Sequence, residues 1–364
     1  MKNKRLILLV SILILNLTLI GCAKVKKEKA IESNEFNIKS GLVIVENYMR
    51  YLSNTDYNNA KKLFTKELYE NTKELKNNEL DVKGYSIENI SEVGKSALIE
   101  MKVVRSKPKS PQAFLDNYTI KVVKEGVEYK ISKIDYSPEK EGFPKAHQIR
   151  QKNKNNVKTD LITEMETIPN YYFPKDDAGN ISKISVSKSN FGAMQFSYSG
   201  EKIAISTSGE NPYLGVISIE DSVATQGQEG GESGGGEKTQ GQDENKNTTG
   251  VKEKPIGKEI VSLDILKGCK LDFMVFSEDG ETLVCQYEKD GGKAIRLYRT
   301  GNGDILPIGF KEAFPIDKVD ILFDSFNKES LNFKIKKREG VKDVETSIPG
   351  KYKVDLKELK ISKL

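Results

Sequence analysis

A short sequence pattern occurs three times in the second half of this chain, and it constrains the fold more than any other feature. The copies are Phe196–Ile205 (FSYSGEKIAI), Phe276–Cys285 (FSEDGETLVC) and the looser Phe323–Phe333 (FDSFNKESLNF). Each copy predicts two antiparallel strands joined by a polar turn. Phe196, Phe276 and Phe323 should face a shared β core, and the turns at Gly200, Gly280 and Asn327 should be exposed. The first phenylalanines of copies two and three are 47 residues apart. Those of copies one and two are 80 apart, or 51 when the polar insert 222–250 is left out.

Strand-forming sequence also flanks the copies. It lies at 181–186 and 214–219 around the first, at 260–266 and 294–298 around the second, and at 341–361 after the third. Repeats of forty to fifty residues with four strands each are typical of β-propeller blades. The sequence motif F-S-x-x-G-x-x-[IL] also resembles the motif in the blades of the periplasmic Tol-system propeller.

Three copies are fewer than the four to eight blades that close a propeller. Three arrangements would account for the missing blades. The sheets could form an open stack, strands could be recruited from residues 138–180, or the domain could assemble with a second copy. A plain series of β-hairpins is the alternative, since S-x-D-G is common turn chemistry.

The N-terminal half has a different periodicity. Apolar residues from Ile38 to Leu52 recur every three or four positions, which predicts a helix over 38–53. Asp56 or Thr55 would cap a second helix that carries Tyr57, Ala60, Leu63, Phe64, Leu68 and Tyr69, and we place Leu63 under a sheet. Long strands follow between 82 and 134, with turns at Gly94-Lys95 and Glu125-Gly126. The pattern predicts an α+β domain, 36–137, of two helices on a curved antiparallel sheet.

The segments Tyr48–Leu52 (YMRYL) and Asp56–Leu63 (DYNNAKKL) resemble the opening of nuclear-transport-factor-2-like domains. This resemblance implies a curved sheet around a long helix, with a cone-shaped pocket between them. Catalytic relatives place a His or Asp inside the cone, whereas the sole histidine here, His147, lies beyond the domain. The resemblance therefore implies a pocket or a partner surface and no chemistry.

The remaining segments complete the predicted domain order. Residues 138–178 connect the halves, and their apolar stretch Ile168–Pro174 is expected to pack between them. A β-repeat domain spans 179–364, with a disordered insert at 222–250 that is too polar to offset the entropy of ordering. The glycines of Gly230–Gly236 do not form a phosphate-binding loop, because no strand precedes them.

The first 22 residues predict where the protein resides. A basic start leads into an uncharged apolar run, 6–20, which ends at Leu19-Ile20-Gly21-Cys22. The segment resembles a lipoprotein signal peptide, 1–21, followed by a polar tether, 22–35. The resemblance implies that Cys22 carries acyl chains that hold the protein at the outer face of a cell membrane.

Net charge argues against a nucleic-acid partner. The chain has 58 basic and 53 acidic residues, and without the basic signal peptide the surplus shrinks further. Lys24, Lys26, Lys27 and Lys29 follow the anchor. They either touch anionic headgroups or form a solvated run.

Residues that carry catalysis are scarce. One histidine excludes a two-histidine metal site, and we expect no cofactor, no metal and no enzyme activity. Asp176-Asp177 with Gly179-Asn180, and Gly301–Asp304, offer oxygen ligands but lack calcium-loop spacing and read as turns. A simple hairpin at Asp279-Gly280 would place Cys285 opposite a residue near Met274, five positions from Cys269. We therefore expect two separate buried thiols, with a Cys269–Cys285 disulfide as the alternative.

Two classes of function remain. The first is a lipid-anchored, extracytoplasmic binding or scaffolding protein that presents its β-repeat surface to a protein or envelope partner. The second is an enzyme or ligand-delivery lipoprotein that uses the N-terminal cone. We expect the first, because repeated sheets generally present surfaces.

Overall fold

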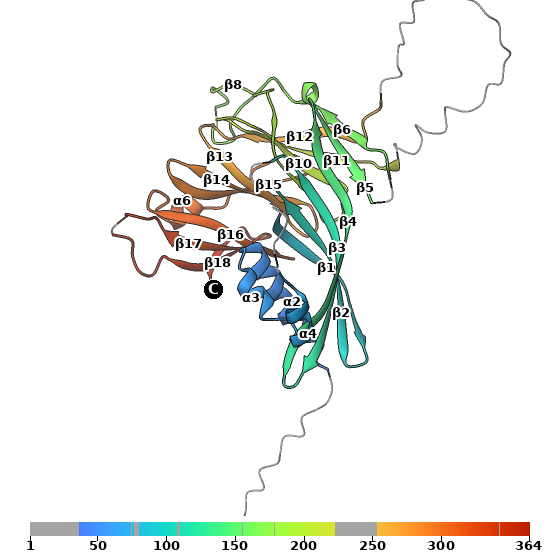
Figure 1. Ribbon diagram of the computed structural model, residues 1–364. Coiled ribbons are helices and arrows are strands. Elements are labelled where there is room, and N and C mark those ends of the chain that lie inside the picture. The colour runs from blue at the N-terminus through green and yellow to red at the C-terminus, as the bar shows by residue number, and fades with distance from the viewer. Residues whose placement is uncertain are drawn as a thin grey trace, which may run out of the picture. The chain divides into compact units, whose positions relative to one another are not determined.

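A six-stranded antiparallel sheet forms the first half of the fold (Figure 1). Its strands lie side by side in chain order: β1 Asp81–Val93, β2 Ser96–Ser106, β3 Ala113–Glu125, β4 Glu128–Lys145, β5 Gln148–Asn153 and β6 Asp160–Glu164. The computed structural model describes residues 36–73, 75, 80–107, 110–154, 156–177, 179–222, 253–341 and 343–364. The described residues are mostly β-structure with few short helices.

Helix α2, Ile38–Ser53, packs against β1, β2, β3 and β4 on the concave side of the curved sheet (Figure 1). Its bounds confirm the predicted helix. Asn37 caps it by accepting a hydrogen bond from Ser40 N at 3.1 Å. Side chains such as Val45 and Met49 of the helix and Ile120 of the sheet are fully buried. Val45 and Met49 thus lie on the side of the sheet on which the resemblance implied a pocket.

The predicted second helix is interrupted, so that expectation is wrong. Helix α3, Tyr57–Lys61, ends before α4, Lys66–Asn71, begins. The residues between them pair with β4, because Ile131 N donates to Leu63 O at 2.8 Å and Thr65 N donates to Ile131 O at 2.9 Å. This extended stretch buries Phe64, which is 5% exposed, and leaves Leu63 half-buried.

The sheet also continues past residue 137, where we expected the first domain to end. Strand β4 runs on to Lys145, so residues 138–164 of the expected connector belong to the sheet. Pro138 is tolerated because it pairs with Asp116 at a register shift in the β3–β4 ladder. The later stretch Ile168–Pro174 packs as expected, with Ile168 buried and Tyr172 against the neighbouring core.

Three small antiparallel sheets follow, each a meander like a propeller blade. The first contains β9 Phe191–Phe196, β10 Lys202–Thr207, β11 Tyr213–Ile219 and β12 Gly257–Ile265. The second contains β13 Lys270–Phe276, β14 Thr282–Lys289 and β15 Gly292–Arg299. The third contains β16 Val319–Asn327, β17 Ser330–Lys337, β18 Gly350–Asp355 and β19 Ile361–Lys363.

The shorter elements lie between these sheets. They are the 3-10 turn η1 Met165–Thr167, the paired strands β7 Tyr171–Tyr172 and β8 Ile184–Ser185, and helix α6 Phe310–Ala313. The strand expected at 181–186 thus joins β7 and not the first small sheet.

The first two copies of the repeat form the same turn. Ser197 N donates to Lys202 O at 2.9 Å, and Ser277 N donates to Thr282 O at 2.8 Å. The glycine that follows has a positive φ in both, 72° at Gly200 and 70° at Gly280. The third copy differs, because β16 runs four residues past Phe323 before it turns.

Two expectations about these copies are wrong. Gly200 and Gly280 are buried, because side chains of the neighbouring sheets cover both turns. Lys140 Nζ donates to Gly200 O at 2.8 Å, and Lys202 Nζ donates to Gly280 O at 3.0 Å. Phe323 is half-buried, unlike Phe196 and Phe276, since it lies in mid-strand.

Strand β12 pairs with β11, so it completes the first small sheet and not the second, to which we had assigned residues 260–266. The second sheet is therefore left with three strands. Residues Asn37–Leu364 form one compact unit that holds both the long sheet and the small ones.

Hydrophobic cores join consecutive sheets. One contains Leu115 and Ile149 of the long sheet and Phe196 and Ile203 of the first small sheet. Another joins the first and second small sheets, and a further one joins the second and third. Successive residues of one strand alternate between cores, as Leu283 and Val284 do.

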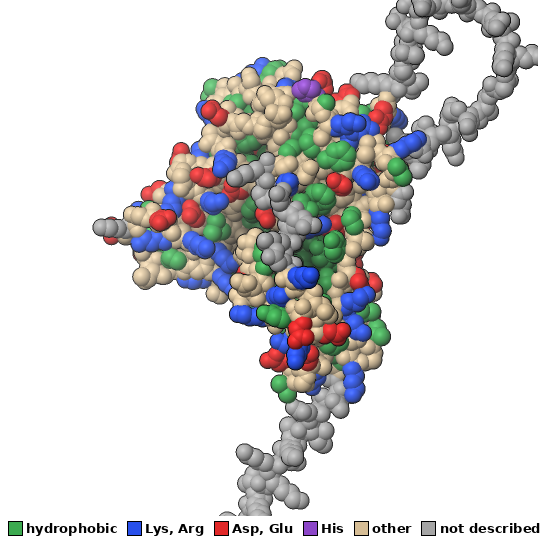
Figure 2. Space-filling view, viewed as in Figure 1, with side chains coloured by type: hydrophobic (Ala, Val, Ile, Leu, Met, Phe, Trp, Pro, Cys, Tyr) green, Lys and Arg blue, Asp and Glu red, His purple; other side chains and the backbone are tan. Residues whose placement is uncertain are grey.

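The surface charges are mixed. Figure 2 shows lysine and arginine interspersed with acidic side chains over the visible face, without a single field of one sign. Within the described part of the chain, no helix is long and apolar enough to cross a membrane.

The interrupted helix gives a stability test. Replacing Phe64 with Ala should lower the free energy of unfolding by about 3 to 5 kcal/mol, because it empties a buried position. Replacing the half-buried Leu63 with Ala should cost less than about 2 kcal/mol. Urea unfolding of both variants measures this difference. A larger loss for the Leu63 variant would contradict the described packing.

Candidate functional site

The last strand of the second small sheet, β15, has an open edge. The sheets before and after it have four strands, whereas this one has three. Beyond its pairing with β14, the described residues give β15 an isolated bridge between Tyr298 and Ile305, flanked by hydrogen bonds from Leu306 N to Leu297 O and from Arg299 N to Asp304 O. The part of the edge that stays open lies before Leu297. An edge strand of this kind can accept another strand.

The hydrogen bonds show which backbone groups face the open side. Thr300 N donates to Glu281 O across the β14–β15 ladder at 2.9 Å. The backbone N–H and C=O groups of the even-numbered residues of β15 therefore point toward β14, and those of the odd-numbered residues point away from it. Leu297 O accepts from Leu306 N, and Lys293 N donates to the Asp320 carboxylate. Within the described chain, Ile295 N, Ile295 O, Leu297 N and Lys293 O have no hydrogen-bond partner.

A groove of about 690 Å³ runs along this edge. Its walls are β15, the segment that follows it, and the start of β16. Its apolar lining includes Ile295, Leu297, Ile305, Ile308, Phe310 and Ile316. Ile305 and Ile316 are 36% and 37% exposed, so the apolar surface reaches solvent. The volume is within the usual range for ligand sites.

The rim of the groove carries charges of both signs, including Lys289, Lys311, Asp290 and Glu312. Such a rim does not select a strongly charged ligand. Recognition here would depend on main-chain hydrogen bonds and on apolar contacts.

A buried carboxylate holds β15 in place. Asp264, at the end of β12, is fully buried and accepts from Arg296 Nη1 and Tyr298 Oη, each at 2.7 Å. It also accepts from Lys175 N and Ile265 N, each at 2.8 Å. Four donors satisfy the charge, which would otherwise be costly to bury.

The same contacts shift the pKa values of the donors. Burial alone would lower the pKa of Arg296, but Tyr298, Tyr287 and Asp264 outweigh it and raise that pKa. Burial, followed by the Asp264 charge, raises the pKa of Tyr298 well above its ordinary value. The guanidinium therefore stays charged and the phenol stays neutral, which fixes both side chains on β15.

The cysteine positions match the predicted hairpin. Cys285 pairs with Met274, and Cys269 and Cys285 are both free thiols, so the alternative disulfide is not formed. Cys285 lies in the core between the first and second small sheets. Cys269 belongs to the same core.

In the two turns that offer oxygen ligands suited to calcium, these oxygens contact other groups of the protein. Asp176 contacts Arg296 at 3.3 Å, and Asp177 accepts from Ser182 N at 2.5 Å. In the other turn, Asn302 Nδ2 donates to Asp304 Oδ2 at 2.6 Å. Across the described residues, no three His, Cys, Asp or Glu side chains are close enough to hold a metal ion.

Other residues singled out in the sequence lie elsewhere. His147 is exposed in the turn between β4 and β5. Cys22 and residues 223–250 of the insert lie outside the described residues.

Sequence reasoning missed the groove, although a signal for it was present. The segment after β15 contains five residues that disfavour a strand: Gly301, Gly303, Pro307, Gly309 and Pro315. At Gly303, which has a φ of 75°, a Cβ atom would come within 2.3 Å of Ser262 O. A fourth strand could have been excluded here from the sequence.

No known protein family matches this sequence, and no curated protein matches it. Among solved structures, it is similar to TolB from Acinetobacter baumannii, with a TM-score of 0.30 and 8% identity over 77% of this chain and 57% of TolB. The β-propeller domain of the Trilobed protease from Pyrococcus furiosus gives 0.30 and 9%, over 78% of this chain and 72% of that domain.

Dipeptidyl peptidase 4 from Porphyromonas gingivalis gives a TM-score of 0.32 and 9% identity over 83% of this chain and 48% of that protein. The chain thus spans little more than half the length of TolB. The similarity to β-propeller structures is distant, and at these TM-scores it says nothing about what the protein binds.

The thiols provide a pH test. Burial raises the pKa of Cys285 well above 9.0 and also raises that of Cys269. Cys285 should therefore stay protonated and react slowly with iodoacetamide at pH 9.0 in the folded protein, because the thiolate is the nucleophile, and Cys269 should react more slowly than it does in denaturant. In denaturant both should react fast. Mass spectrometry measures the labelling of each cysteine. Rapid labelling of Cys285 in the folded protein would contradict its burial.

Proposed function

We propose that this protein is a lipid-anchored, extracytoplasmic binding protein that holds an extended segment of a protein partner in the groove beside β15. The open edge of β15 carries the proposal. The segment Leu19–Cys22 at the end of the signal peptide supports the membrane anchor. Such an anchor implies a location at the outer face of the cell membrane.

Strand addition explains how the groove would bind. A segment lying antiparallel or parallel to β15 would pair with the unpartnered groups of Lys293 and Ile295, up to the point where Leu306 N already donates to Leu297 O. Lys293 to Ile295 span three positions, so about three partner residues would be bound along the edge, at roughly 3.3 Å each. Alternate partner side chains would face the apolar wall at Ile305 and Ile316. The preferred partner is therefore a segment with apolar residues at every second position.

We assign the N-terminal part to the nuclear-transport-factor-2-like group and the three small sheets to blade-like repeats, on the strength of the sequence resemblances. Val45 and Met49 of α2, which packs on the concave side of the sheet, are fully buried. This packing supports a binding role over the alternative of an enzyme or ligand-delivery protein with a pocket there.

Charged substitutions in the groove test this function. Ile305→Asp and Ile316→Asp should each weaken peptide binding at least about tenfold, because they place a charge where an apolar side chain would be buried. Ile181→Asp is the matched control, since Ile181 is 85% exposed and does not line the groove. The probes are peptides selected from a displayed library against the full chain in detergent, measured by fluorescence polarisation.

Selected peptides should show apolar residues at alternate positions. Equal binding by the two groove variants and the control would contradict the proposal, as would peptides that bind through a different face. Capture of a partner from membranes by the full chain would then identify the natural segment.

The anchor has its own test. Replacing Cys22 with Ala should leave an uncleaved precursor and abolish incorporation of a fatty-acid analogue, because no thiol remains for the lipid. Continued labelling of this variant would show that the anchor lies elsewhere.

A further inference from the structure

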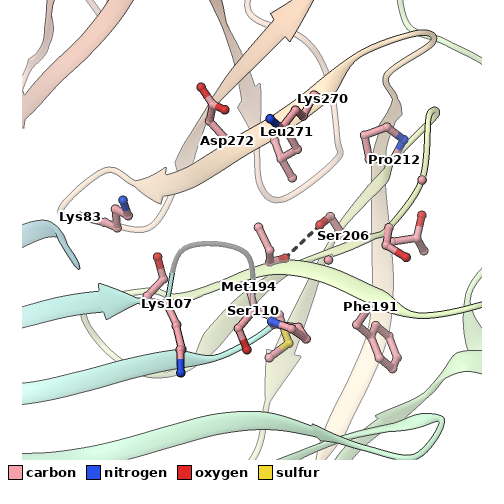
Figure 3. Close-up of a pocket in the computed structure, with 17 residues that line it drawn as sticks. Lys83, Lys107, Ser110, Phe191, Met194, Ser206, Pro212, Lys270, Leu271 and Asp272 are labelled. Atoms are coloured by element: carbon pink, nitrogen blue, oxygen red, sulfur yellow. Dashed lines mark hydrogen bonds between the residues drawn. The ribbon is translucent and has the colours of Figure 1, made fainter. Parts of the chain in front are cut away.

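A second cavity lies where the long sheet meets the first two small sheets. It has a volume of about 290 Å³ and lies among the ends of β2 and β10 and the starts of β9 and β13. In Figure 3, Lys83, Lys270 and Asp272 lie on one side of it, and Met194 and Ser206 lie on the other. This cavity is separate from the groove beside β15.

Positive charge dominates the described lining. Three lysines, Lys83, Lys107 and Lys270, line the cavity together with one acidic residue, Asp272. The Asp272 carboxylate contacts Lys293 Nζ at 2.6 Å, which offsets its charge. Lys83 pairs with Asp81 at 3.1 Å, while Lys270 has no charged partner within the described chain.

A hydroxyl in the same cavity also lacks a partner. Ser106, at the end of β2, is 9% exposed and makes no side-chain hydrogen bond to any described residue. Ser206 is already used, because its Oγ donates to Ala193 O at 3.1 Å, as the dashed line in Figure 3 marks. The Ser106 hydroxyl lines the cavity, so it can donate a hydrogen bond to a ligand there.

We propose that this cavity binds a phosphate group. Lysine ammonium groups bind phosphate as point charges, and hydroxyl donors add directed hydrogen bonds. The donors come from separate strands, Lys83 from β1, Ser106 from β2 and Lys270 from β13. A tetrahedral anion can accept from donors on several strands at once, whereas a carboxylate presents its two oxygens in one plane. The site does not depend on the peptide groove.

Titration calorimetry on the full chain in detergent, at physiological salt, tests the site with inorganic phosphate as the probe. Ser106→Ala should weaken binding about tenfold, as expected for a hydrogen bond to a charged group. Lys270→Gln should weaken it about three- to fivefold, as expected for an exposed charge. Lys267→Gln is the matched control, because Lys267 is an exposed lysine outside the cavity, and it should change binding less than twofold, about the limit of a distant screened charge.

Circular dichroism checks that each variant is folded. Equal losses in the Lys267 and Lys270 variants would overturn the proposal, because they would indicate general charge attraction. The absence of saturable phosphate binding would overturn it as well.

Two further probes distinguish the source of the phosphate. Glycerol 3-phosphate represents a free monoester, and glycerophosphoglycerol represents the diester of a lipid headgroup or polymer. Whichever binds more tightly, with the same dependence on Ser106, identifies the source. Displacement of phosphate by an equal concentration of acetate would overturn the assignment to phosphate.

Discussion

Burial of both faces of the small sheets is the constraint on which the rest of the structure depends. In a strand, successive side chains point to opposite faces, so a strand between two layers needs apolar side chains on both faces. Strand β14 shows this, because Leu283 and Cys285 enter one core while Val284 enters the next. Neither core can form without this sheet, and a one-residue slip of β14 would exchange the two sets of side chains. The register of the second sheet thus fixes the layers on both sides of it.

The open edge of β15 follows from how the chain supplies strands to these layers. Strand β12 pairs with β11 and completes the first sheet, and the glycine- and proline-rich segment after β15 cannot supply a replacement. An unsupported edge strand would be free to twist away, but Asp264 of β12 holds Arg296 and Tyr298 of β15. The first sheet therefore positions the edge of the second. Rigid placement of unpaired backbone groups favours binding, because less ordering remains to be done when a partner arrives.

Local patterns in the sequence predicted the local structure well. The helix over 38–53, the turns after Phe196 and Phe276, and the pairing of Cys285 with Met274 all follow from periodicity and turn residues. The errors concern tertiary pairing. Phe64 turns inward because β4 pairs with its neighbours, and β12 joins the sheet before the polar insert and not the one after it. Neither partner is visible from spacing alone. The groove was missed for the same reason, since an unpaired edge is defined by a strand that does not form.

The central claim is that β15 presents unpaired backbone groups to an extended partner. Hydrogen exchange of the Ile295 amide, resolved by NMR on the full chain with and without a selected peptide, tests this most directly. This amide should exchange quickly in the free protein, because it has no hydrogen-bond partner among the described residues. A bound strand should slow its exchange, while the Tyr298 amide, which faces β14, should exchange slowly throughout. Slow exchange of Ile295 in the free protein, or no change when peptide binds, would contradict the account.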